Sequence, residues 1–339
     1  MSRFPIFKAP QLVQYLILKS AEPSELFVLA LCSKRAFHFV KFNLGSNAQN
    51  WKLEFLCDWK SREVHLNEIK VVGICARGET YGQGNNELCS LKFKARVHEC
   101  HVERDEDGKL DTVWEDLELG KQVIPSLVTE LFGVGIHTAS IDESGISTLQ
   151  FLNENQTSKI QEITYFDEIG ISADHLRSLL LDFPATRKLT IDAKTPPNFQ
   201  FNEPFPSFYM LKLSHAPWIT VEQIMRMDQI EEIMIGDSTC TSTDLNRFLK
   251  HWLAGGSPKL RFLSVEIAVR NASLFDGLEH LAVHSYQFRE MDLYGGLRIY
   301  QLIGDRYDIT RGDGARITLH AGLDYIQCQC DFLVRPRPE

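Results

Sequence analysis

One pattern recurs in Leu211-Lys212-Leu213, Ile233-Met234-Ile235 and Leu263-Ser264-Val265, where a variable residue stands between two apolar residues. The same pattern occurs earlier in the chain at residues 139–141, 163–165 and 189–191. Successive copies begin 24, 26, 22, 22 and 30 residues apart. Alternation of apolar and other residues is typical of a strand with one buried face, so each copy predicts a short strand.

Helical segments separate the predicted strands. Thr220 with Gln223, and Thr241 with Asp244, have the spacing of capping boxes, which begin helices. A strand and a helix repeated about every 25 residues predict a leucine-rich-repeat-like solenoid over residues 136–270. Neighbouring units of a solenoid bury one face of each strand, so a continuous curved sheet is expected.

The middle residue of each predicted strand should face away from the helices, because successive side chains of a strand alternate between its two faces. Solenoids bind partners on such strand faces, so we expect a protein-binding surface here. Its predicted members are Thr164, Phe166, Thr190, Lys212, Met234 and Ser264. Phe166 and Met234 are the large apolar members, and Phe262 is expected beside them; aromatic and methionine side chains are common in interfaces.

Three further regions surround the predicted solenoid. Residues 1–45 contain three short helical patterns, the second of which begins at Pro23. Four stretches alternate apolar and polar residues: 51–59, 68–76, 88–102 and 110–117. They predict an antiparallel β meander within residues 46–135, followed by a helix that ends at Gly133. Residues 271–339 are expected to form a β-rich cap with a C-terminal hairpin, and the predicted fold class is therefore α+β.

The composition excludes several classes of protein. The chain has 339 residues, a formal net charge of −9 and 44% hydrophobic residues, which is typical of a folded globular protein and argues against a general nucleic-acid binder. Its longest stretch without a charged side chain, Leu131–Ile141, is too short to cross a bilayer. Eight scattered cysteines and no signal-peptide pattern predict an intracellular protein, in the cytoplasm or the nucleus.

The first 45 residues stand apart in charge, because their six basic and two acidic side chains give +4. They contain Phe4-Pro5-Ile6-Phe7, Pro10-x-Leu12-Val13, Pro23-Ser24-Glu25-Leu26 and Leu31-Cys32-Ser33-Lys34-Arg35. In order and spacing these motifs resemble an F-box of the nematode type. The resemblance implies docking onto a Skp-type adaptor, which is acidic and links to a cullin–RING ubiquitin ligase. The residues that match its adaptor-facing positions are Pro10, Leu12, Val13, Leu16, Leu26, Leu31, Cys32 and Lys34. Ala9 stands where the family usually has leucine.

The second half of the chain carries a further set of motifs. They are Pro217-Trp218-Ile219-Thr220, the run from Asp244 to Trp252, Pro258-x-Leu260 and the run from Tyr307 to Gly314. These motifs resemble the F-box-associated domain of nematode F-box proteins, most clearly over about 200–267 and 305–320. The resemblance implies recognition of a protein substrate. We therefore expect the substrate-recognition subunit of a Skp–cullin–F-box ubiquitin ligase, and the alternative is an F-box scaffold or inhibitor that binds its target without promoting degradation.

No motif for catalysis or for cofactor binding occurs in the chain. His98, Cys100 and His101 lie near Cys89 in the sequence, but the paired spacings of zinc ligands are missing, so no metal site is expected. Cys328 and Cys330 are expected to be structural thiols. We therefore expect a non-enzymatic protein without a cofactor, and a metal- or thiol-dependent hydrolase based on the His98 cluster is the remaining alternative.

Overall fold

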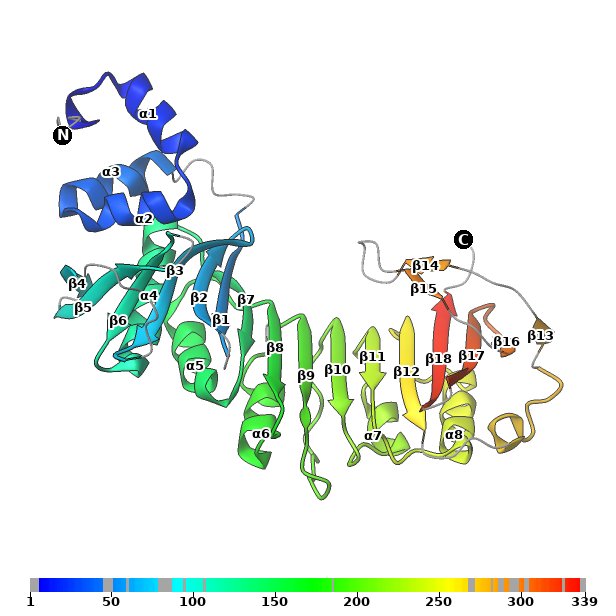
Figure 1. Cartoon of the computed structure of the whole chain (residues 1–339). Helices are drawn as coiled ribbons and strands as arrows, with labels where there is room; N and C mark the ends of the chain where they lie inside the picture. The colour runs from blue at the N-terminus through cyan, green and yellow to red at the C-terminus, as the bar shows by residue number, and fades with distance from the viewer. Residues whose placement is uncertain are drawn as a thin grey trace. The chain divides into compact units, whose positions relative to one another are not determined.

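The computed structural model of the chain is shown in Figure 1. It describes residues 6–44, 51–58, 61–78, 87–93, 96–105, 108–184, 186–267, 272–281, 283–285, 290–292, 299–301, 305–324 and 327–335. The chain divides into two compact units, Met1–Ile163 and Thr164–Glu339. No helix in these described ranges is both long and apolar enough to span a bilayer. Helices and strands both contribute heavily, so the fold is mixed α and β.

Three short helices begin the first unit, as the sequence predicts. They are α1 (Gln11–Ser20), α2 (Pro23–Leu31) and α3 (Lys34–Leu44), and together with a 3-10 turn at Ile6–Lys8 they form a segment called the head. Pro23 opens α2, where its missing N–H costs no helical hydrogen bond. The Glu25 carboxylate accepts a 2.9 Å hydrogen bond from the Glu22 backbone N–H, which caps the same helix.

The sheet of the first unit differs from the expected meander. Its strands are β1 (Leu53–Cys57), β2 (Arg62–Leu66), β3 (Ile69–Ala76), β4 (Glu87–Phe93), β5 (Arg96–Arg104), β6 (Leu110–Trp114) and β7 (Ile136–Ile141). Their order is β7-β1-β2-β3-β6-β5-β4, and β1–β7 and β3–β6 are parallel pairs. The prediction of a purely antiparallel meander is therefore wrong, and the single stretch 88–102 is two strands. Alternation of side chains identifies a strand and its buried face, but it does not specify the neighbouring strand.

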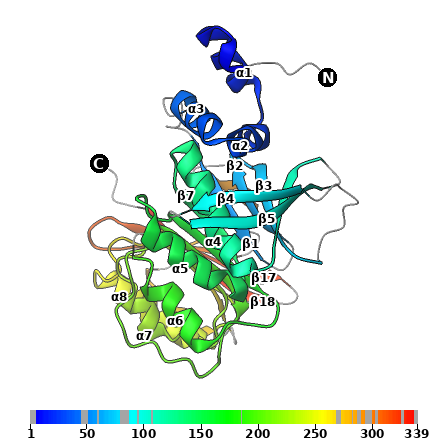
Figure 2. The ribbon, with the colours of Figure 1, turned by 90° about the vertical axis from the view of Figure 1, so that its left-hand side faces the viewer.

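One long helix supports this sheet. It is α4 (Leu117–Phe132), which begins where the Asp116 side chain accepts a hydrogen bond from the Leu119 N–H and ends at left-handed Gly133. It contacts β2, β3 and β6, and α5 (Ile146–Asn155) packs beside it. The head joins the same unit, because α2 packs against β3 and α4 while α3 packs against α4 (Figure 2). The head therefore has one side turned toward the sheet layer and another side toward solvent.

The second unit is built on a ladder of parallel strands. These are β8 (Glu162–Asp167), which spans the boundary of the two units, β9 (Lys188–Lys194), β10 (Met210–His215), β11 (Glu232–Ile235) and β12 (Phe262–Ile267). The strands from β9 to β12 pair in parallel, with Leu189, Leu211, Ile233 and Leu263 in register. The predicted strands at 163–165, 189–191, 211–213, 233–235 and 263–265 are therefore confirmed, and their apolar residues are buried.

Helices cover one face of this ladder (Figure 1). They are α6 (Ala173–Leu181), α7 (Val221–Arg226) and α8 (Ser242–Leu253). Both predicted capping boxes are present: Thr220 pairs with Gln223 at the start of α7, and Thr241 pairs with Asp244 at the start of α8. The connection from β9 to β10 differs from the predicted strand–helix unit. No helix forms there in the described residues, and the buried rings of Phe199, Phe201 and Phe205 lie in this connection instead.

Antiparallel strands close the ladder at its far edge. β12 pairs with β18 (Gln327–Arg335), and the order continues through β17 (Arg316–Asp324) and β16 (Asp305–Thr310) to β13 (Val283–Ser285). A separate small pair is formed by β14 (Glu290–Asp292) and β15 (Ile299–Gln301). The described part of the C-terminal region is therefore rich in β structure, and β16–β17 form a hairpin at Arg311–Ala315.

Candidate protein-binding surfaces

The first candidate surface is the solvent side of the head. Leu12 is 69% exposed, Phe42 is 82% exposed, and Val13 and Leu16 are also exposed. A helix as short as α1 buries only a narrow stripe, and Leu18 is its buried residue. Several large apolar side chains close together on one small segment mark an interaction site rather than the scattered exposure found on ordinary surfaces.

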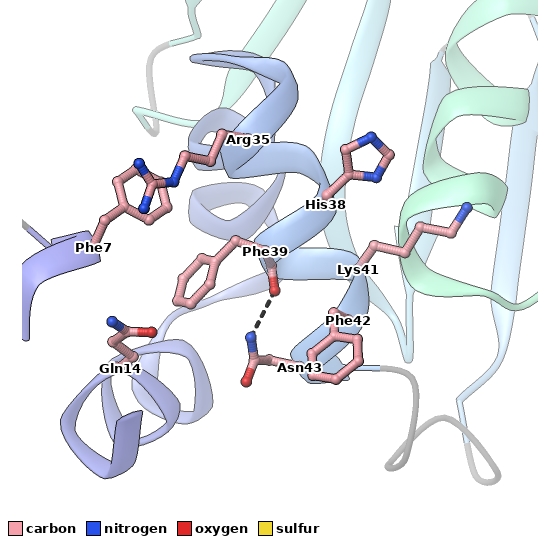
Figure 3. Close-up of a pocket in the computed structure, with 8 residues that line it drawn as sticks. All are labelled: Phe7, Gln14, Arg35, His38, Phe39, Lys41, Phe42 and Asn43. Carbon is pink, nitrogen blue, oxygen red and sulfur yellow. Dashed lines mark hydrogen bonds between the residues drawn. The ribbon is translucent and has the colours of Figure 1, made fainter. Parts of the chain in front are cut away.

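An open pocket of about 600 Å³ lies on this surface between α1 and α3 (Figure 3). Its lining residues are Phe7, Gln14, Arg35, His38, Phe39, Lys41, Phe42 and Asn43. The Phe7 and Phe39 rings meet edge to face at 5.4 Å, and the Arg35 guanidinium lies 4.7 Å from the Phe7 ring centre. Asn43 Nδ2 donates a 2.8 Å hydrogen bond to the Phe39 carbonyl, which fixes the end of α3. The pocket is therefore aromatic with a basic border, which suits an apolar partner that carries acidic groups.

Most of the predicted adaptor-facing residues lie on the exposed side of the head. Pro10, Leu12, Val13, Leu16, Cys32 and Lys34 are exposed, and Leu31 is half-buried. Leu26 differs, because it is 4% exposed and belongs to α2, the helix that packs against β3 and α4. The side chain already contributes to the core of the first unit, and its contact with a partner stays a prediction.

The sequence prediction also missed the residues that line the pocket. Phe7, Arg35, Phe39 and Phe42 are placed together by the turn before α1 and by one face of α3. The sequence does carry a signal for them, because basic residues and phenylalanines both recur in α3 between Lys34 and Phe42. That signal does not reveal a pocket until Phe7 is brought against α3.

The second candidate surface is the face of β8–β12 that the helices leave uncovered, here called the open sheet face. Thr164, Phe166, Thr190, Lys212 and Met234 are half-exposed on it, whereas the intervening apolar residues are buried. Thr190, Lys212 and Met234 are aligned on neighbouring strands. The predicted alternation is therefore confirmed, and these side chains form a continuous row across the sheet.

Two residues expected on this face are buried instead. Ser264 and Phe262 are each 6% exposed, although both belong to the correct face of β12. The cause is β18, which pairs with β12 and sets Asp331 opposite Ser264. The Ser264 hydroxyl donates a 2.6 Å hydrogen bond to the Asp331 carboxylate, so this position is an internal polar contact rather than an exposed one.

The open sheet face also carries an acidic residue that no sequence pattern singled out. Glu232 lies on β11, two residues before Met234 and on the same face. Its Oε1 accepts a 2.8 Å hydrogen bond from the Tyr209 hydroxyl. Burial and this bond to Glu232 raise the pKa of Tyr209, because the hydroxyl proton is held by a carboxylate.

Thiols and imidazoles are dispersed in the described part of the chain. No group of three or more His, Cys, Asp or Glu side chains there is arranged to hold a metal ion. Of the residues near His98, Cys100 is buried in the core, and the side chain of Cys89 lies outside the described residues. The side chain of Cys328 also lies outside them. Burial raises the pKa of Cys57 and of Cys240 to about 11, which makes both thiols poor nucleophiles at neutral pH.

Comparison with known proteins agrees with part of the sequence interpretation. Residues 199–265 match the family model described as F-box associated. The Skn-1 dependent zygotic transcript 15 protein of Caenorhabditis elegans is 22% identical over 342 residues, which cover 93% of each chain. The E3 ubiquitin-protein ligase hecw-1 of the same organism is 41% identical over 54 residues, which cover 16% of this chain and 4% of hecw-1.

No solved structure matches the chain. The family match runs from the β9–β10 connection to β12, so it includes α7, α8 and three strands of the open sheet face. Sequence motifs had predicted this similarity over nearly the same residues. Residues 199–265 are thus similar to an F-box-associated domain.

Proposed function

We propose that the protein is the substrate-recognition subunit of a Skp–cullin–F-box ubiquitin ligase. The head docks on a Skp-type adaptor, and the second unit, a leucine-rich-repeat-like solenoid, binds a protein substrate. The observation that carries the proposal is the exposed apolar and basic head surface in a chain that also contains an F-box-associated segment. The protein itself has no catalytic role in this scheme, because the transfer of ubiquitin belongs to other subunits.

The chemistry of the head supports adaptor docking. Leu12, Leu16 and Phe42 expose apolar side chains that gain about 1.5–3 kcal/mol each when a partner buries them fully. Arg35 and Lys41 border the adjacent pocket, and the first 45 residues carry a net charge of +4. An acidic adaptor of the kind that the F-box resemblance implies is complementary to this surface, and complementary charge also raises the rate of association.

The open sheet face supports substrate binding. Its half-exposed row joins aromatic, methionine and lysine side chains on a rigid ladder of parallel strands. Residues held on strands present a defined geometry to a partner, which reduces the conformational entropy lost on binding. Joining this face and the head in one chain holds the substrate near the ligase and raises its effective concentration there.

Co-purification with a recombinant Skp-type adaptor tests the docking step. The double substitution Leu12→Ala and Leu16→Ala should abolish co-purification, because it removes two exposed apolar anchors from α1. The matched control is Ile169→Ala, since Ile169 is 92% exposed in the second unit and should not affect the adaptor. Adaptor recovery at the unsubstituted level with the double variant would show that the head does not dock in this way.

Ala9 favours the alternative, a scaffold or inhibitor that binds its target without degradation. A half-buried alanine stands where the F-box resemblance predicts leucine, so an adaptor contact of the family is reduced. The two functions separate in a reconstituted reaction with adaptor, cullin–RING subunits, ubiquitin and a bound target. Ubiquitylated target supports the ligase subunit, whereas a bound target that stays unmodified supports the scaffold.

A further inference from the structure

The open sheet face is not uniform in charge. The part on β9 and β10 carries Lys188, Lys194 and Lys212 together with Asp192, and its net charge is positive. The part on β11, β12 and β18 carries Glu232, Glu266 and Asp331, and it has no lysine or arginine among the described side chains of that face. This second part is therefore acidic, and the half-exposed Met234 lies on β11, the strand of this part that pairs with β10.

Glu232 has an unusual environment within this acidic part. Its side chain is nearly enclosed, with the residue 4% exposed, and the aligned residues on the neighbouring strands are Met210 and Phe262. Oε1 accepts the Tyr209 hydrogen bond, but Oε2 has no hydrogen-bond partner among the described residues. A buried polar atom without a partner destabilises the folded protein, so a donor supplied by a ligand would recover free energy here.

Two cationic side chains close to Tyr209, the hydrogen-bond partner of Glu232, are engaged elsewhere. Arg187 lies over the Tyr209 ring, with its guanidinium 5.5 Å from the ring centre. Arg261 pairs with the neighbouring residue Glu231 at 3.6 Å. Neither of these groups forms a described hydrogen bond with Glu232, so the acidic oxygen is left to an outside donor.

We propose that the acidic part of the open sheet face binds a basic, extended segment of the protein substrate. The inference rests on the proposed function and specifies the class of substrate. An arginine or lysine of that segment donates to Oε2 of Glu232, and its aliphatic stem packs on Met234. Charge-assisted hydrogen bonds of this kind are about twice as strong as neutral ones, and long basic side chains bury their stems on apolar groups.

Two properties of the face favour this occupant over others. An acidic segment would meet Glu232 and the half-exposed Glu266, and like charges across an interface oppose binding. Met234 lies two residues after Glu232, on the same side of β11, and is half-exposed. Methionine has three rotatable bonds and adapts to a partner more readily than a branched side chain.

Fluorescence anisotropy with the full chain tests the proposal. The probe is a short fluorescein-labelled peptide that alternates arginine and valine, and the comparison peptide has glutamate in place of arginine. The arginine peptide should bind more tightly than the glutamate peptide, and Glu232→Gln should weaken it by about tenfold, which is the effect of about 1.4 kcal/mol. Tighter binding of the glutamate peptide would overturn the proposal.

Glu231→Gln is the matched control, because it removes the same charge from the adjacent residue, which lies half-buried beside Arg261. Binding by this variant should stay within about twofold, since a long-range contribution of one charge is small in salt. Equal losses in the two variants would mean attraction by net charge alone and would contradict a site at Glu232.

A second variant covers the case in which Glu232→Gln does not fold. Met234→Lys places a competing cation on the same face of the strand, and it should also abolish binding of the arginine peptide. Undiminished binding by a folded Met234→Lys protein would contradict the proposal. Adaptor co-purification distinguishes failure of the basic-segment site from failure of the proposed ligase function. Adaptor binding without peptide binding refutes only the basic-segment site. Peptide binding without adaptor binding refutes only the ligase function.

Discussion

The head surface and the open sheet face present their side chains in opposite ways. On the head, Leu12 and Phe42 extend from short helices and are mostly exposed. On the open sheet face, Thr190, Lys212 and Met234 are aligned with one another on inner strands of the sheet and are half-exposed. A short helix has few neighbours to cover its outer side, whereas an inner strand of a sheet always has two. The head therefore leaves large apolar groups in solvent, whereas the side chains of the sheet face are partly covered by their neighbours on the strands.

The largest expected effect separates the two sides of the head. Leu26→Ala should lower the free energy of unfolding by about 2–5 kcal/mol, because it empties a buried position where α2 meets the sheet layer. Leu12→Ala should change it by less than about 0.5 kcal/mol, because that side chain is already in solvent. Urea denaturation measures both values, and similar losses would show that the two leucines are equally buried.

The rate of thiol alkylation should differ between the exposed cysteine of the head and two buried cysteines. Cys32 is exposed on the head, whereas Cys57 and Cys240 are buried with pKa values raised to about 11. At pH 8 a thiol of that pKa is ionised in about one molecule in a thousand, so iodoacetamide should label Cys32 at least about a hundredfold faster. Mass spectrometry of timed samples measures the labelling rate of each cysteine. In protein unfolded in urea, the three cysteines should react at similar rates.

The same thiols give a pH dependence of stability. Burial raises their pKa, so the folded protein holds these protons to higher pH than the unfolded chain. Their contribution is complete below about pH 9 and is lost as the pH rises toward about 11. Melting temperatures across this range should fall less steeply for Cys240→Ala than for the unsubstituted protein, and parallel curves would contradict the assignment.

Adaptor affinity should respond to Ala9. Ala9→Leu should tighten adaptor binding by about 1.5–3 kcal/mol if a leucine pocket of the partner is unfilled. Ala9 precedes α1, and its carbonyl accepts a 2.8 Å hydrogen bond from Gln14 Nε2, which holds this backbone in place for the new side chain. Isothermal titration with a Skp-type adaptor measures the change, with Ala254→Leu in the second unit as the control. An unchanged or weaker affinity would show that the local geometry differs from the F-box pattern.

The smallest expected difference lies within the open sheet face. Ser264→Ala should lower the free energy of unfolding by about 1–3 kcal/mol, because it removes the buried hydrogen bond to Asp331. Thr190→Ala, in the same row and half-exposed, should change it by no more than about 0.5 kcal/mol. Chemical denaturation distinguishes these values. Equal effects would mean that the row is uniformly exposed, as the sequence alone predicted.

Local signals were sufficient for much of the fold. Thr220, Thr241 and Gly133 mark helix ends because capping depends on residues within one turn. The strands of the parallel ladder were found because each has a buried apolar pair at a two-residue period. The similarity of residues 199–265 to an F-box-associated domain was also predicted from short motifs in that segment.

Non-local contacts account for what the sequence did not predict. The parallel pairing of β3 with β6 depends on where a later strand returns, which alternation does not encode. Leu26 was assigned to a partner because nothing in its own helix shows that α2 meets β3 and α4. The unpartnered oxygen of Glu232 depends on Tyr209 and on residues of two neighbouring strands, so a single-strand pattern had no means of indicating it.

The pairing of β12 with β18 has a consequence for how the chain is made. During synthesis β12 emerges long before Gln327–Arg335, so one edge of the parallel ladder stays unpaired until β18 arrives. An unpaired strand edge can pair with another chain, and it is a common origin of aggregation in nascent or truncated proteins. A chain shortened before Gln327 should therefore accumulate in insoluble form even though every residue of 199–265, the segment similar to an F-box-associated domain, is present.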